Sequence, residues 1–425
     1  MSGLRAGSRV AVVGLAATLA GCWWPAPGAG PDRRAHNGAE TTITADTAGS
    51  LHQIWSAPTD GPAGDPVTSG AGVHVEGTDH AYGFRTDGSL RWSVPVPGGH
   101  GDIADFTAVL VEGDRVLAVH EGLESTEFAP DANAGVWLDP RTGAPVGPGT
   151  TADGVRDGLA AGSHSQYLDG IYGESLQIAD AETGEVLYGG LLSISFIGSP
   201  PEAPSHVTLG AGPVFQSGPG LPADQQGIAD LGVRAFPRQG AARNCGPPQI
   251  PSFACPTWTT DLAGSVATPV VVSADQSMLY VGVDDTLHVL DAVTGEVLWT
   301  APAGSSITDA PAVGLGHVFV PTSGGELVVV PEDGCGSAVC AASWTGATGG
   351  AVSVQPAVVG SGAGAVVITG GADGGLDAFA VAGCGAASCP PIWSGPAGSP
   401  VTGAPAVSNG QVYVGTAAGL VAFGV

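Results

Sequence analysis

A repeated unit of short strands constrains this chain more than any other feature. Its clearest copy spans residues 280–330, where Val, Leu, Tyr and Phe alternate with polar residues in short runs separated by Gly, Asp or Ser-Gly. Alternation with a period of two predicts antiparallel strands joined by hairpins. The element Asp291-Ala-Val-Thr-Gly295 is a predicted turn, because an Asp side chain bonds forward to the backbone and Gly accepts a positive φ.

Tryptophans mark the outermost strand of each unit in the C-terminal half. Trp258, Trp299, Trp344 and Trp393 follow one another at intervals of 41, 45 and 49 residues. A Pro-containing run such as Ala310-Pro-Ala-Val313 lies between successive tryptophans and predicts the innermost strand. A period of 40 to 50 residues with four short strands per unit is typical of a β-propeller.

The N-terminal half keeps the same register less strictly. Outermost-strand positions are predicted at Trp55, Trp92, Gly147 and Tyr188, which makes eight with the four tryptophans above. The gaps of 55 and 70 residues before positions 147 and 258 indicate insertions. These insertions, roughly 121–136 and 190–245, are candidate contact regions, and we expect the second to form a protruding contact loop.

The two ends of the repeat region predict how the ring closes. One outermost strand, around Trp55, precedes every other strand, and only three strands follow Trp393. Pairing the first strand with the last three leaves no open sheet edge. We therefore predict an all-β, eight-bladed propeller of four-stranded antiparallel blades over residues 51–425. Seven blades remain the alternative if the stretch between 188 and 258 is miscounted.

The seven cysteines divide into Cys22 and six that form local pairs. Each pair precedes an outermost-strand Trp, where other units carry Asp-x-x-Thr-Gly. An even count in an exported chain favours disulfides that staple the turn before that strand. A zinc site is the alternative, but the spacings lack a two-residue Cys motif and no His lies close in sequence. The predicted pairs are Cys245 with Cys255, Cys335 with Cys340, and Cys384 with Cys389.

The N-terminus predicts an export signal and a lipid anchor. Arg5 and Arg9 precede the apolar run 10–20, which is too short to span a bilayer. The run ends in Leu19-Ala-Gly-Cys22, which resembles the lipobox of bacterial lipoproteins. We thus expect a signal peptide over 1–21 and lipidation of Cys22; an ordinary cleaved signal is the alternative. Residues 22–50, rich in Pro, Gly, Ala and Thr, predict a flexible tether.

The charge of the chain argues against two classes of partner. The formal net charge is −27, and all twelve basic residues are Arg. An acidic body without a basic cluster is a poor ligand for nucleic acid or for an anionic lipid surface. We expect a monomeric body that contacts the membrane only through Cys22.

The pattern Asp-x-x-Thr-Gly-x-x-x-Trp, complete from Asp291 to Trp299, resembles the tryptophan-docking motif of quinoprotein (PQQ-type) eight-bladed propellers. The resemblance covers residues 50–425 and implies that the Trp of one blade stacks on its neighbour. A lipidated, exported propeller also resembles BamB, which implies a part in outer-membrane assembly. The implied blade-docking residues are Trp55, Trp92, Trp258, Trp299, Trp344 and Trp393.

This chain lacks residues that active quinoprotein enzymes use. That family uses a disulfide between adjacent cysteines, a calcium ion and an Asp base, and this chain has no adjacent Cys pair and is shorter. Ten scattered His residues form no ligand motif, and Asp131-Ala-Asn133 and Asp284-Asp285 lack a calcium-loop pattern. We therefore expect no catalytic residues, no metal, no PQQ and no calcium.

Position alone suggests a binding site at the mouth of the central channel. Thr308, Asp309 and Gln355 come just before the prolines of two innermost strands. They are candidates for contact with a ligand or peptide, or else line a solvated channel.

Together these features predict a membrane-anchored, extracytoplasmic lipoprotein that acts as a non-enzymatic, protein-binding scaffold of the cell envelope. The alternatives are an exported quinoprotein-type dehydrogenase or sugar-binding enzyme, and a receptor or sensor subunit. The sequence names no partner.

Overall fold

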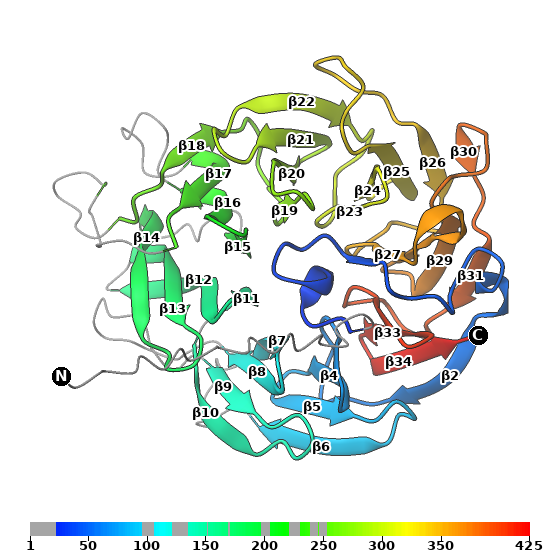
Figure 1. The fold of residues 1–425 in the computed structure, drawn as a ribbon, viewed down its shortest axis with the longest axis horizontal. Helices are drawn as coiled ribbons and strands as arrows, with labels where there is room; N and C mark the ends of the chain where they lie inside the picture. The colour runs from blue at the N-terminus through cyan, green and yellow to red at the C-terminus, as the bar shows by residue number, and fades with distance from the viewer. Residues whose placement is uncertain are drawn as a thin grey trace, which may run out of the picture.

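Eight sheets surround one axis in the computed structural model (Figure 1). The structure describes residues 23–95, 106–120, 135–150, 152–168, 171–196, 205–220, 230–238, 245 and 253–425. Each sheet has four antiparallel strands, and two sheets carry a fifth strand that is added in parallel. The predicted all-β, eight-bladed propeller is confirmed, so the alternative of seven blades is wrong.

The blades are numbered here in chain order, from the innermost to the outermost strand. Blade 1 holds β3 (Val67–Ser69), β4 (Gly72–Glu76), β5 (His80–Phe84) and β6 (Leu90–Pro95). Blade 2 holds β7 (Phe106–Glu112), β8 (Arg115–His120), β9 (Gly135–Leu138) and β10 (Pro145–Gly149). Blade 3 holds β11 (Gly154–Arg156), β12 (Leu159–Leu168), β13 (Ile171–Asp180) and β14 (Val186–Phe196). Blade 4 holds β15 (His206–Leu209), β16 (Val214–Gly220), β17 (Asp230–Phe236) and β18 (Trp258–Asp261).

The C-terminal half continues the ring and closes it. Blade 5 holds β19 (Val271–Val272), β20 (Met278–Val283), β21 (Thr286–Asp291) and β22 (Val297–Pro302). Blade 6 holds β23 (Ala312–Gly314), β24 (His317–Pro321), β25 (Glu326–Pro331) and β26 (Trp344–Ala347), with β30 (Ser388–Cys389) added. Blade 7 holds β27 (Ala357–Val359), β28 (Val366–Gly370), β29 (Gly375–Ala380) and β31 (Trp393–Pro396), with β1 (His36–Asn37) added. Blade 8 holds β32 (Ala406–Ser408), β33 (Gln411–Thr416), β34 (Gly419–Gly424) and β2 (His52–Ala57). The 3₁₀ turns are η1 (Pro27–Ala29), η2 (Ala48–Ser50) and η3 (Gly362–Gly364).

The predicted closure of the ring is confirmed. Strand β2 pairs antiparallel with β34, which places Trp55 opposite Ala422 and Ser56 opposite Val421. The first strand of the repeat thus completes the sheet that the last three strands begin. All eight predicted outermost-strand positions lie in the outermost strands, including Gly147 in β10 and Tyr188 in β14.

The Asp-x-x-Thr-Gly element forms the turn that its sequence predicts. The Asp291 carboxylate accepts hydrogen bonds from the amides of Val293 and Thr294 at 2.9 and 2.8 Å. Gly295 has a φ of +77°, a conformation that other residues adopt only with strain. These bonds, that from the Thr294 amide above all, lower the pKa of Asp291.

Tryptophans from the outermost strands dock on the next blade, as the family resemblance implies. Most of these rings pack closely on a glycine in the turn before the outermost strand of the next blade. A Cβ added at Gly295, for example, would lie 2.5 Å from the Trp258 ring. The same contact joins Trp55 to Gly88, Trp92 to Gly143, Trp299 to Gly334 and Trp344 to Gly383. Trp393 instead donates to the carbonyl of Leu51 at 2.9 Å.

Blades 2 and 3 make this contact with other residues. Trp137 of β9 is fully buried and donates from its indole to the carbonyl of Ala181 in the next turn, at 2.6 Å. Tyr188 of β14 donates to the carbonyl of Cys255 at 3.1 Å and accepts from its amide at 2.7 Å. Sequence analysis missed Trp137 because this residue stands in the third strand of its blade, outside the repeat position.

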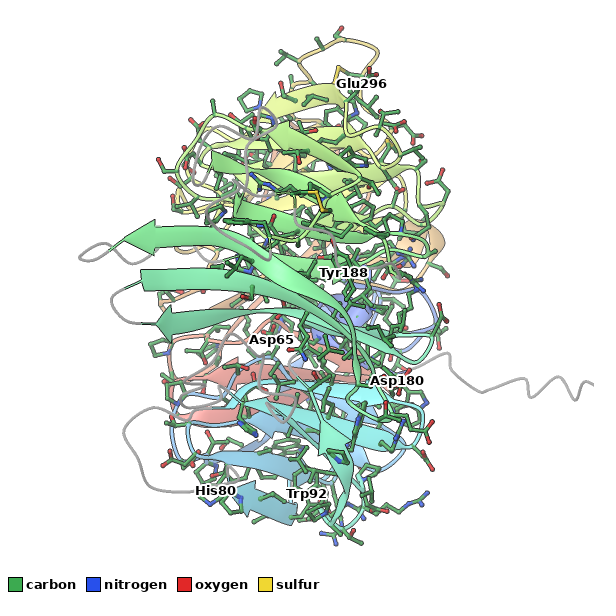
Figure 2. The ribbon with its side chains drawn as sticks, turned by 90° about the vertical axis from the view of Figure 1, so that its left-hand side faces the viewer. Asp65, His80, Trp92, Asp180, Tyr188 and Glu296 are labelled. Atoms are coloured by element: carbon green, nitrogen blue, oxygen red, sulfur yellow. A yellow bond between two sulfur atoms is a disulfide. The ribbon has the colours of Figure 1, made fainter. Side chains whose placement is uncertain are left out.

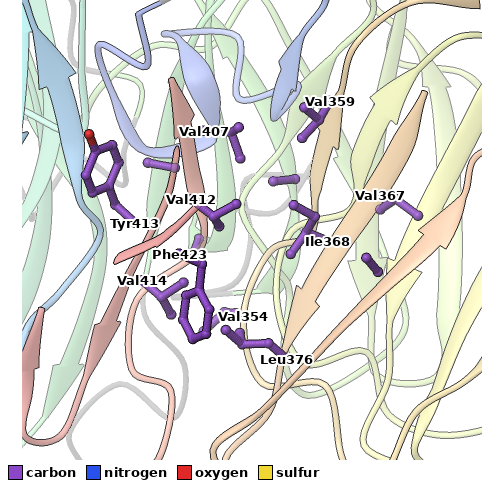
Figure 3. Packing of buried hydrophobic residues seen from close by; sticks show 14 of the residues in the cluster. Val354, Val359, Val367, Ile368, Leu376, Val407, Val412, Tyr413, Val414 and Phe423 are labelled. Carbon is purple, nitrogen blue, oxygen red and sulfur yellow. The ribbon is translucent and has the colours of Figure 1, made fainter. Parts of the chain in front are cut away.

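The hydrophobic core fills the spaces between adjacent blades. Figure 3 shows the junction of blades 7 and 8, where Val359 and Ile368 lie near Val407, Val412 and Phe423. These five side chains are at most 2% exposed. The layers between blades hold the ring, and those of blades 6, 7, 8 and 1 merge into one continuous core.

The three predicted disulfides are confirmed, with one addition to their predicted role. Cys245 pairs with Cys255, Cys335 with Cys340, and Cys384 with Cys389. Each pair lies before an outermost strand, and each loop also pairs with the outermost strand of the preceding blade. The amide of Thr300 in β22 donates to Ala338, and the amide of Thr345 in β26 donates to Ala387. The loops therefore cover strand edges that solvent would otherwise reach.

Two predictions about loops are wrong. The flexible tether over 22–50 is corrected, because residues 24–40 lie inside the ring, where Trp24 is buried to 1% exposure, and the chain then runs outward to β31, where Leu51 accepts from Trp393. Within the expected insertion over 190–245, the described residues include the end of β14 and also β15, β16 and β17, three strands of blade 4, so this stretch is not simply a loop. Cys22 and most of the insertion at 121–136 lie outside the described residues.

Blade 3 extends beyond the other blades. Its strands β12, β13 and β14 have 10, 10 and 11 residues, and they project past one face of the ring (Figure 2). Among the described residues, no helix has the length and apolar character needed to cross a membrane.

The docking contact predicts a large loss of stability when a docked tryptophan is truncated. Trp299 is 6% exposed and lies on Gly334 of the next blade. We expect Trp299→Ala to lower the free energy of unfolding by about 3–5 kcal/mol, measured by guanidinium denaturation. Trp23→Ala is the matched control, since Trp23 is 36% exposed. Equal losses in the two variants would contradict the docking role.

The disulfide loops predict a local effect on the neighbouring blade. Replacing Cys335 and Cys340 by Ser is expected to cost about 2 kcal/mol through the released loop entropy. It should also speed hydrogen exchange at the Thr300 amide, whose acceptor lies in that loop. Replacing Cys384 and Cys389 should speed exchange at Thr345 and leave Thr300 unchanged. Unaltered exchange at Thr300 in the first variant would show that the loop docks without its disulfide.

Candidate functional site

The centre of the ring is occupied by the chain itself. Residues 24–40, called here the axial segment, lie on the axis between the innermost strands (Figure 1). The segment enters beside blade 1 and leaves beside blade 8, before the chain continues to β2. Its backbone bonds follow the chain order of the blades, and the Arg33 side chain supplies the bond to blade 3. The segment makes a hydrogen bond to an innermost strand, or to a residue next to one, in all eight blades.

Most of these bonds join backbone to backbone. The innermost strands donate and the axial segment accepts in blades 1, 2, 4, 5, 6 and 7, with distances of 2.7 to 3.1 Å. The donors are the amides of Thr68, Val111, Leu209, Val272, Val313 and Val358, and their acceptors are the carbonyls of Trp24, Pro25, Pro31, Asp32, Arg34 and Ala35. In blade 8 the Asn37 amide group donates to Val407 at 2.8 Å. In blade 3 the Arg33 guanidinium donates to the Asp153 carbonyl at 3.2 Å.

The local sequence explains how the axial segment turns inside a narrow space. Gly28 has a φ of +69°, and a Cβ there would lie 2.7 Å from the Arg33 Cα. The Ala35 amide donates to the Gly28 carbonyl at 2.7 Å, which closes a compact loop. Arg33 and Ala35 themselves have φ values of +54° and +53°, a left-handed conformation that costs about 1–2 kcal/mol per residue. The surrounding bonds must offset this strain.

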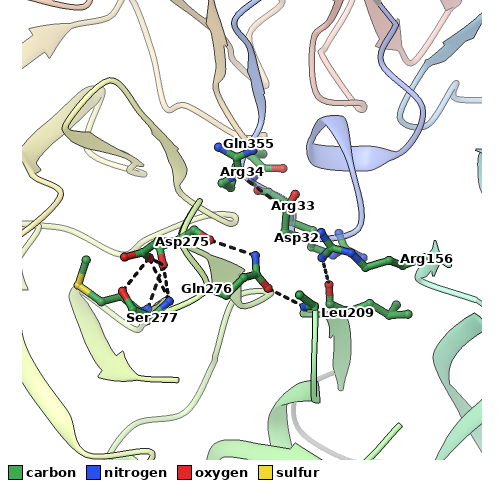
Figure 4. A network of polar contacts seen from close by, with 12 residues as sticks. Asp32, Arg33, Arg34, Arg156, Leu209, Asp275, Gln276, Ser277 and Gln355 are labelled. Carbon is green, nitrogen blue, oxygen red and sulfur yellow. Dashed lines mark hydrogen bonds and ion pairs between the residues drawn. The ribbon is translucent and has the colours of Figure 1, made fainter. Parts of the chain in front are cut away.

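Arg33 is the charged residue at the centre of this arrangement. Its guanidinium reaches the residue before β11, and its carbonyl accepts from Gln355 at 2.7 Å. Its Nε is buried without a hydrogen-bond partner among the described residues. Figure 4 shows Arg33 beside Asp32, Arg34 and Gln355 on the axis, with Arg156 donating to Leu209 nearby.

Carboxyl groups from several blades face this arginine. Asp65 and Asp153 lie at the starts of the innermost strands of blades 1 and 3, and Asp309 at that of blade 6. Burial raises the pKa of Asp65 and of Asp153, and the charge of Arg33 opposes part of each rise. Burial and then Asp65 raise the pKa of Asp309 to about 6, again with Arg33 opposing.

Glu76 in β4 is the least favourably placed carboxyl. It is 7% exposed, and its Oε2 has no hydrogen-bond partner among the described residues. Burial, followed by the nearby charge of Asp65, raises the pKa of Glu76 to about 8. Glu76 is therefore largely protonated at neutral pH.

The three residues predicted at the channel mouth do lie close together, but they bind the chain itself. Thr308 donates to the Val352 carbonyl at 2.6 Å. The Asp309 carboxylate accepts from the Gln355 amide at 2.9 Å, and the Gln355 side chain donates to Arg33 and Pro311. Gln355 is 4% exposed. Sequence position located these residues, but it gave no sign that the axial segment would occupy the space between them.

The described residues contain no group of three or more His, Cys, Asp or Glu side chains arranged to hold a metal ion. The Asp284 carboxylate accepts from the amides of Ser265 and Val266 and so belongs to a turn. His288 and His317 lie in β21 and β24, where burial lowers the pKa of both. The segment Asp131-Ala-Asn133 lies outside the described residues.

The fold agrees with a sequence match over part of the chain. Residues 256–383 match the family described as outer membrane protein assembly factor BamB. The resemblance to PQQ-type, BamB-like eight-bladed propellers is confirmed. A search of curated proteins finds no match.

Solved structures show the same fold at low sequence identity. BamB from Moraxella catarrhalis is 15% identical with a TM-score of 0.52, covering 88% of this chain and 97% of that one. Quinohemoprotein alcohol dehydrogenase ADHIIG from Pseudomonas putida HK5 is 13% identical with a TM-score of 0.63, covering 95% and 80%. The quinohemoprotein alcohol dehydrogenase from Comamonas testosteroni is 14% identical with a TM-score of 0.60, covering 94% and 80%. These similar structures include two alcohol dehydrogenases and BamB, and at this identity the similarity concerns the fold alone.

The residues at the axis do not fit a bound PQQ with calcium. The three described disulfides join cysteines that are 5 or 10 residues apart, so none is the adjacent-Cys disulfide of quinoprotein enzymes. The space on the axis between the innermost strands contains Arg33 and the backbone of its neighbours.

The buried carboxyls predict a pH dependence of stability. The raised pKa of Glu76 means that the folded chain binds more protons than the unfolded chain between pH 4.5 and about 8. Stability should therefore fall as pH rises through this window, by at most about 1.4 kcal/mol per pH unit for this proton. Asp309 adds a change of the same sign at lower pH.

The variant Glu76→Gln should flatten this fall, measured as the free energy of unfolding between pH 5 and 8.5. Glu296→Gln is the control, because Glu296 is exposed on the turn before β22 (Figure 2). A slope that stays the same in Glu76→Gln would contradict the assignment.

Proposed function

We propose that this protein is a membrane-anchored, extracytoplasmic propeller that binds other envelope proteins and catalyses no reaction. The observation that carries the proposal is the filled axis. The innermost strands of a propeller converge there, and in this chain residues 24–40 take the position that a small ligand would need. Binding is then left to the rims, the faces and the projecting strands.

The chemistry of the cysteines supports an exported location. Three disulfides are present in a chain of this size, and disulfides persist in oxidising compartments outside the cytoplasm. The match to a BamB-like family over residues 256–383 supports a role in contacts between envelope proteins. The lipobox-like sequence before Cys22 supports an anchor, and several acyl chains hold a protein on a membrane far better than one.

The corrected tether defines how the anchored body would sit. Trp24 is buried and its amide donates to Thr68 in blade 1 at 2.7 Å. A lipid on Cys22 would be separated from this fixed point by Trp23 alone, within about 8 Å of chain. The propeller would therefore lie against the bilayer, with the face around Trp23 toward the membrane. It would not stand off from the membrane at the end of a long spacer.

The projecting strands of blade 3 are the favoured contact surface for a partner. Strands β12, β13 and β14 extend past the ring (Figure 2). Such strands present backbone groups at an edge, and addition of a partner strand is a common mode of recognition. We propose these strands, and not a protruding loop over 190–245, as the contact surface.

The test of the proposed function is crosslinking in intact cells, followed by mass spectrometry. The wild-type protein should sediment with membranes and crosslink to a defined set of envelope proteins. Cys22→Ala should be released from the membrane and lose most of these crosslinks, because the anchor no longer concentrates the protein there. If Cys22→Ala still sedimented with membranes like the wild type, the anchor would be contradicted. If the wild type crosslinked to no more proteins than an unrelated exported protein does, the scaffold role would be contradicted.

The second candidate is a quinoprotein-type dehydrogenase, favoured by the fold that this chain shares with alcohol dehydrogenases. Purified protein is mixed with PQQ and calcium, and its melting temperature and its dye reduction with alcohols and sugars are measured. The proposed function expects neither a shift nor turnover. Substrate-dependent dye reduction would make the enzyme the better assignment.

A further inference from the structure

The axial segment contacts the ring as a bound peptide contacts a receptor. Its carbonyls accept from the edges of six innermost strands, and β1 adds to β27 in parallel through His36 and Asn37. Strand addition of this kind takes its affinity from the main chain and its specificity from a few side chains. The side chains that serve here are Trp24, Arg33 and Asn37.

These three side chains reach different parts of the ring. Trp24 is 1% exposed and lies in the core that joins blades 1, 6, 7 and 8. Asn37 is 6% exposed and donates to Val407 in blade 8. Arg33 lies between them and donates to Asp153 of blade 3 at 3.2 Å. An apolar residue, a central arginine and an amide thus define the sequence that this site selects.

The ring has its own closure, which does not involve the axial segment. Strand β2 completes blade 8 by pairing with β34, from His52 to Ala57. The connection between the axial segment and β2 contains exposed residues, among them Asp46, Gly49 and Ser50. The chain can therefore be cut in this connection without breaking a pairing between blades.

We propose that the centre of the ring is a binding site for an arginine-bearing peptide that folds into a compact loop there, and that residues 24–40 are its resident ligand, held in cis. Arg33 is the specificity residue of this ligand. The inference goes beyond the proposed function, because it concerns the axis and does not depend on the membrane anchor or on the crosslinked partners.

The covalent link makes the resident ligand hard to replace. A short connection gives a tethered segment an effective concentration in the millimolar range, so a free peptide competes poorly with the intact chain. Cutting the connection removes this advantage and leaves the affinity of the site itself to be measured. The carboxyls of Asp65, Asp153 and Asp309 remain in the ring after the cut.

The experiment uses the full chain with a protease site inserted between Gly49 and Ser50. The folded protein is cut, and the uptake of a fluorescent synthetic peptide of residues 23–49 is followed by anisotropy. We expect the peptide to bind, to be displaced by its unlabelled copy, and to lose about tenfold or more in affinity with Arg33→Gln. The peptide with Arg34→Gln is the matched control, since Arg34 pairs only with the neighbouring Asp32 at 3.3 Å among the ion pairs of the described residues.

Two results would overturn the proposal. Failure of the cut ring to take up the labelled peptide would show that the axial segment is an inseparable part of the fold. Equal binding of the Arg33→Gln and Arg34→Gln peptides would remove Arg33 as the specificity residue. Because the substitutions are made in the peptide alone, the comparison of the Arg33→Gln and Arg34→Gln peptides cannot reflect misfolding of the ring.

Discussion

The structure depends on how the backbone groups at the edges of the blades are paired. A four-stranded sheet has two edges, and each edge carries amides and carbonyls that need partners when they are buried. In this ring the inner edges face the axis and receive carbonyls from residues 24–40. On three blades the outer edge receives a disulfide loop from the next blade, as at Thr300 and Thr345. The same physical need thus shapes both the centre and the rim of the molecule.

The fold could be predicted because its signals are local in sequence. The alternating runs, the Asp-x-x-Thr-Gly turns and the spacing of the tryptophans recur every 40 to 50 residues, so the blades and the closure followed from them. The disulfides could be predicted for the same reason, since the two cysteines of a pair are 5 or 10 residues apart. Trp137 could not be predicted as a docking residue, because its role depends on how the third strand of blade 2 faces the Ala181 turn.

The axial segment could not be predicted because its position in the ring depends on bonds to distant parts of the chain. Its composition of Pro, Gly and Ala without periodicity is that of a flexible spacer. Its partners, from Thr68 to Val407, become neighbours only after the ring has closed. Position before a strand was enough to find Thr308, Asp309 and Gln355. Asp65 holds the same position before Pro66, but Asp153 and Glu76 follow no such pattern. Their common property is the burial of a carboxyl near one arginine, and burial is set by the tertiary fold.

Filling the axis changes where function can reside in a propeller. An open axis allows a small ligand to contact all eight blades at once, and residues lining it can then act together on that ligand. Here those contacts belong to the axial segment, whose strained φ values at Arg33 and Ala35 persist because bonds from every blade hold it. Strain that is maintained by the whole ring makes the segment sensitive to any change in blade position.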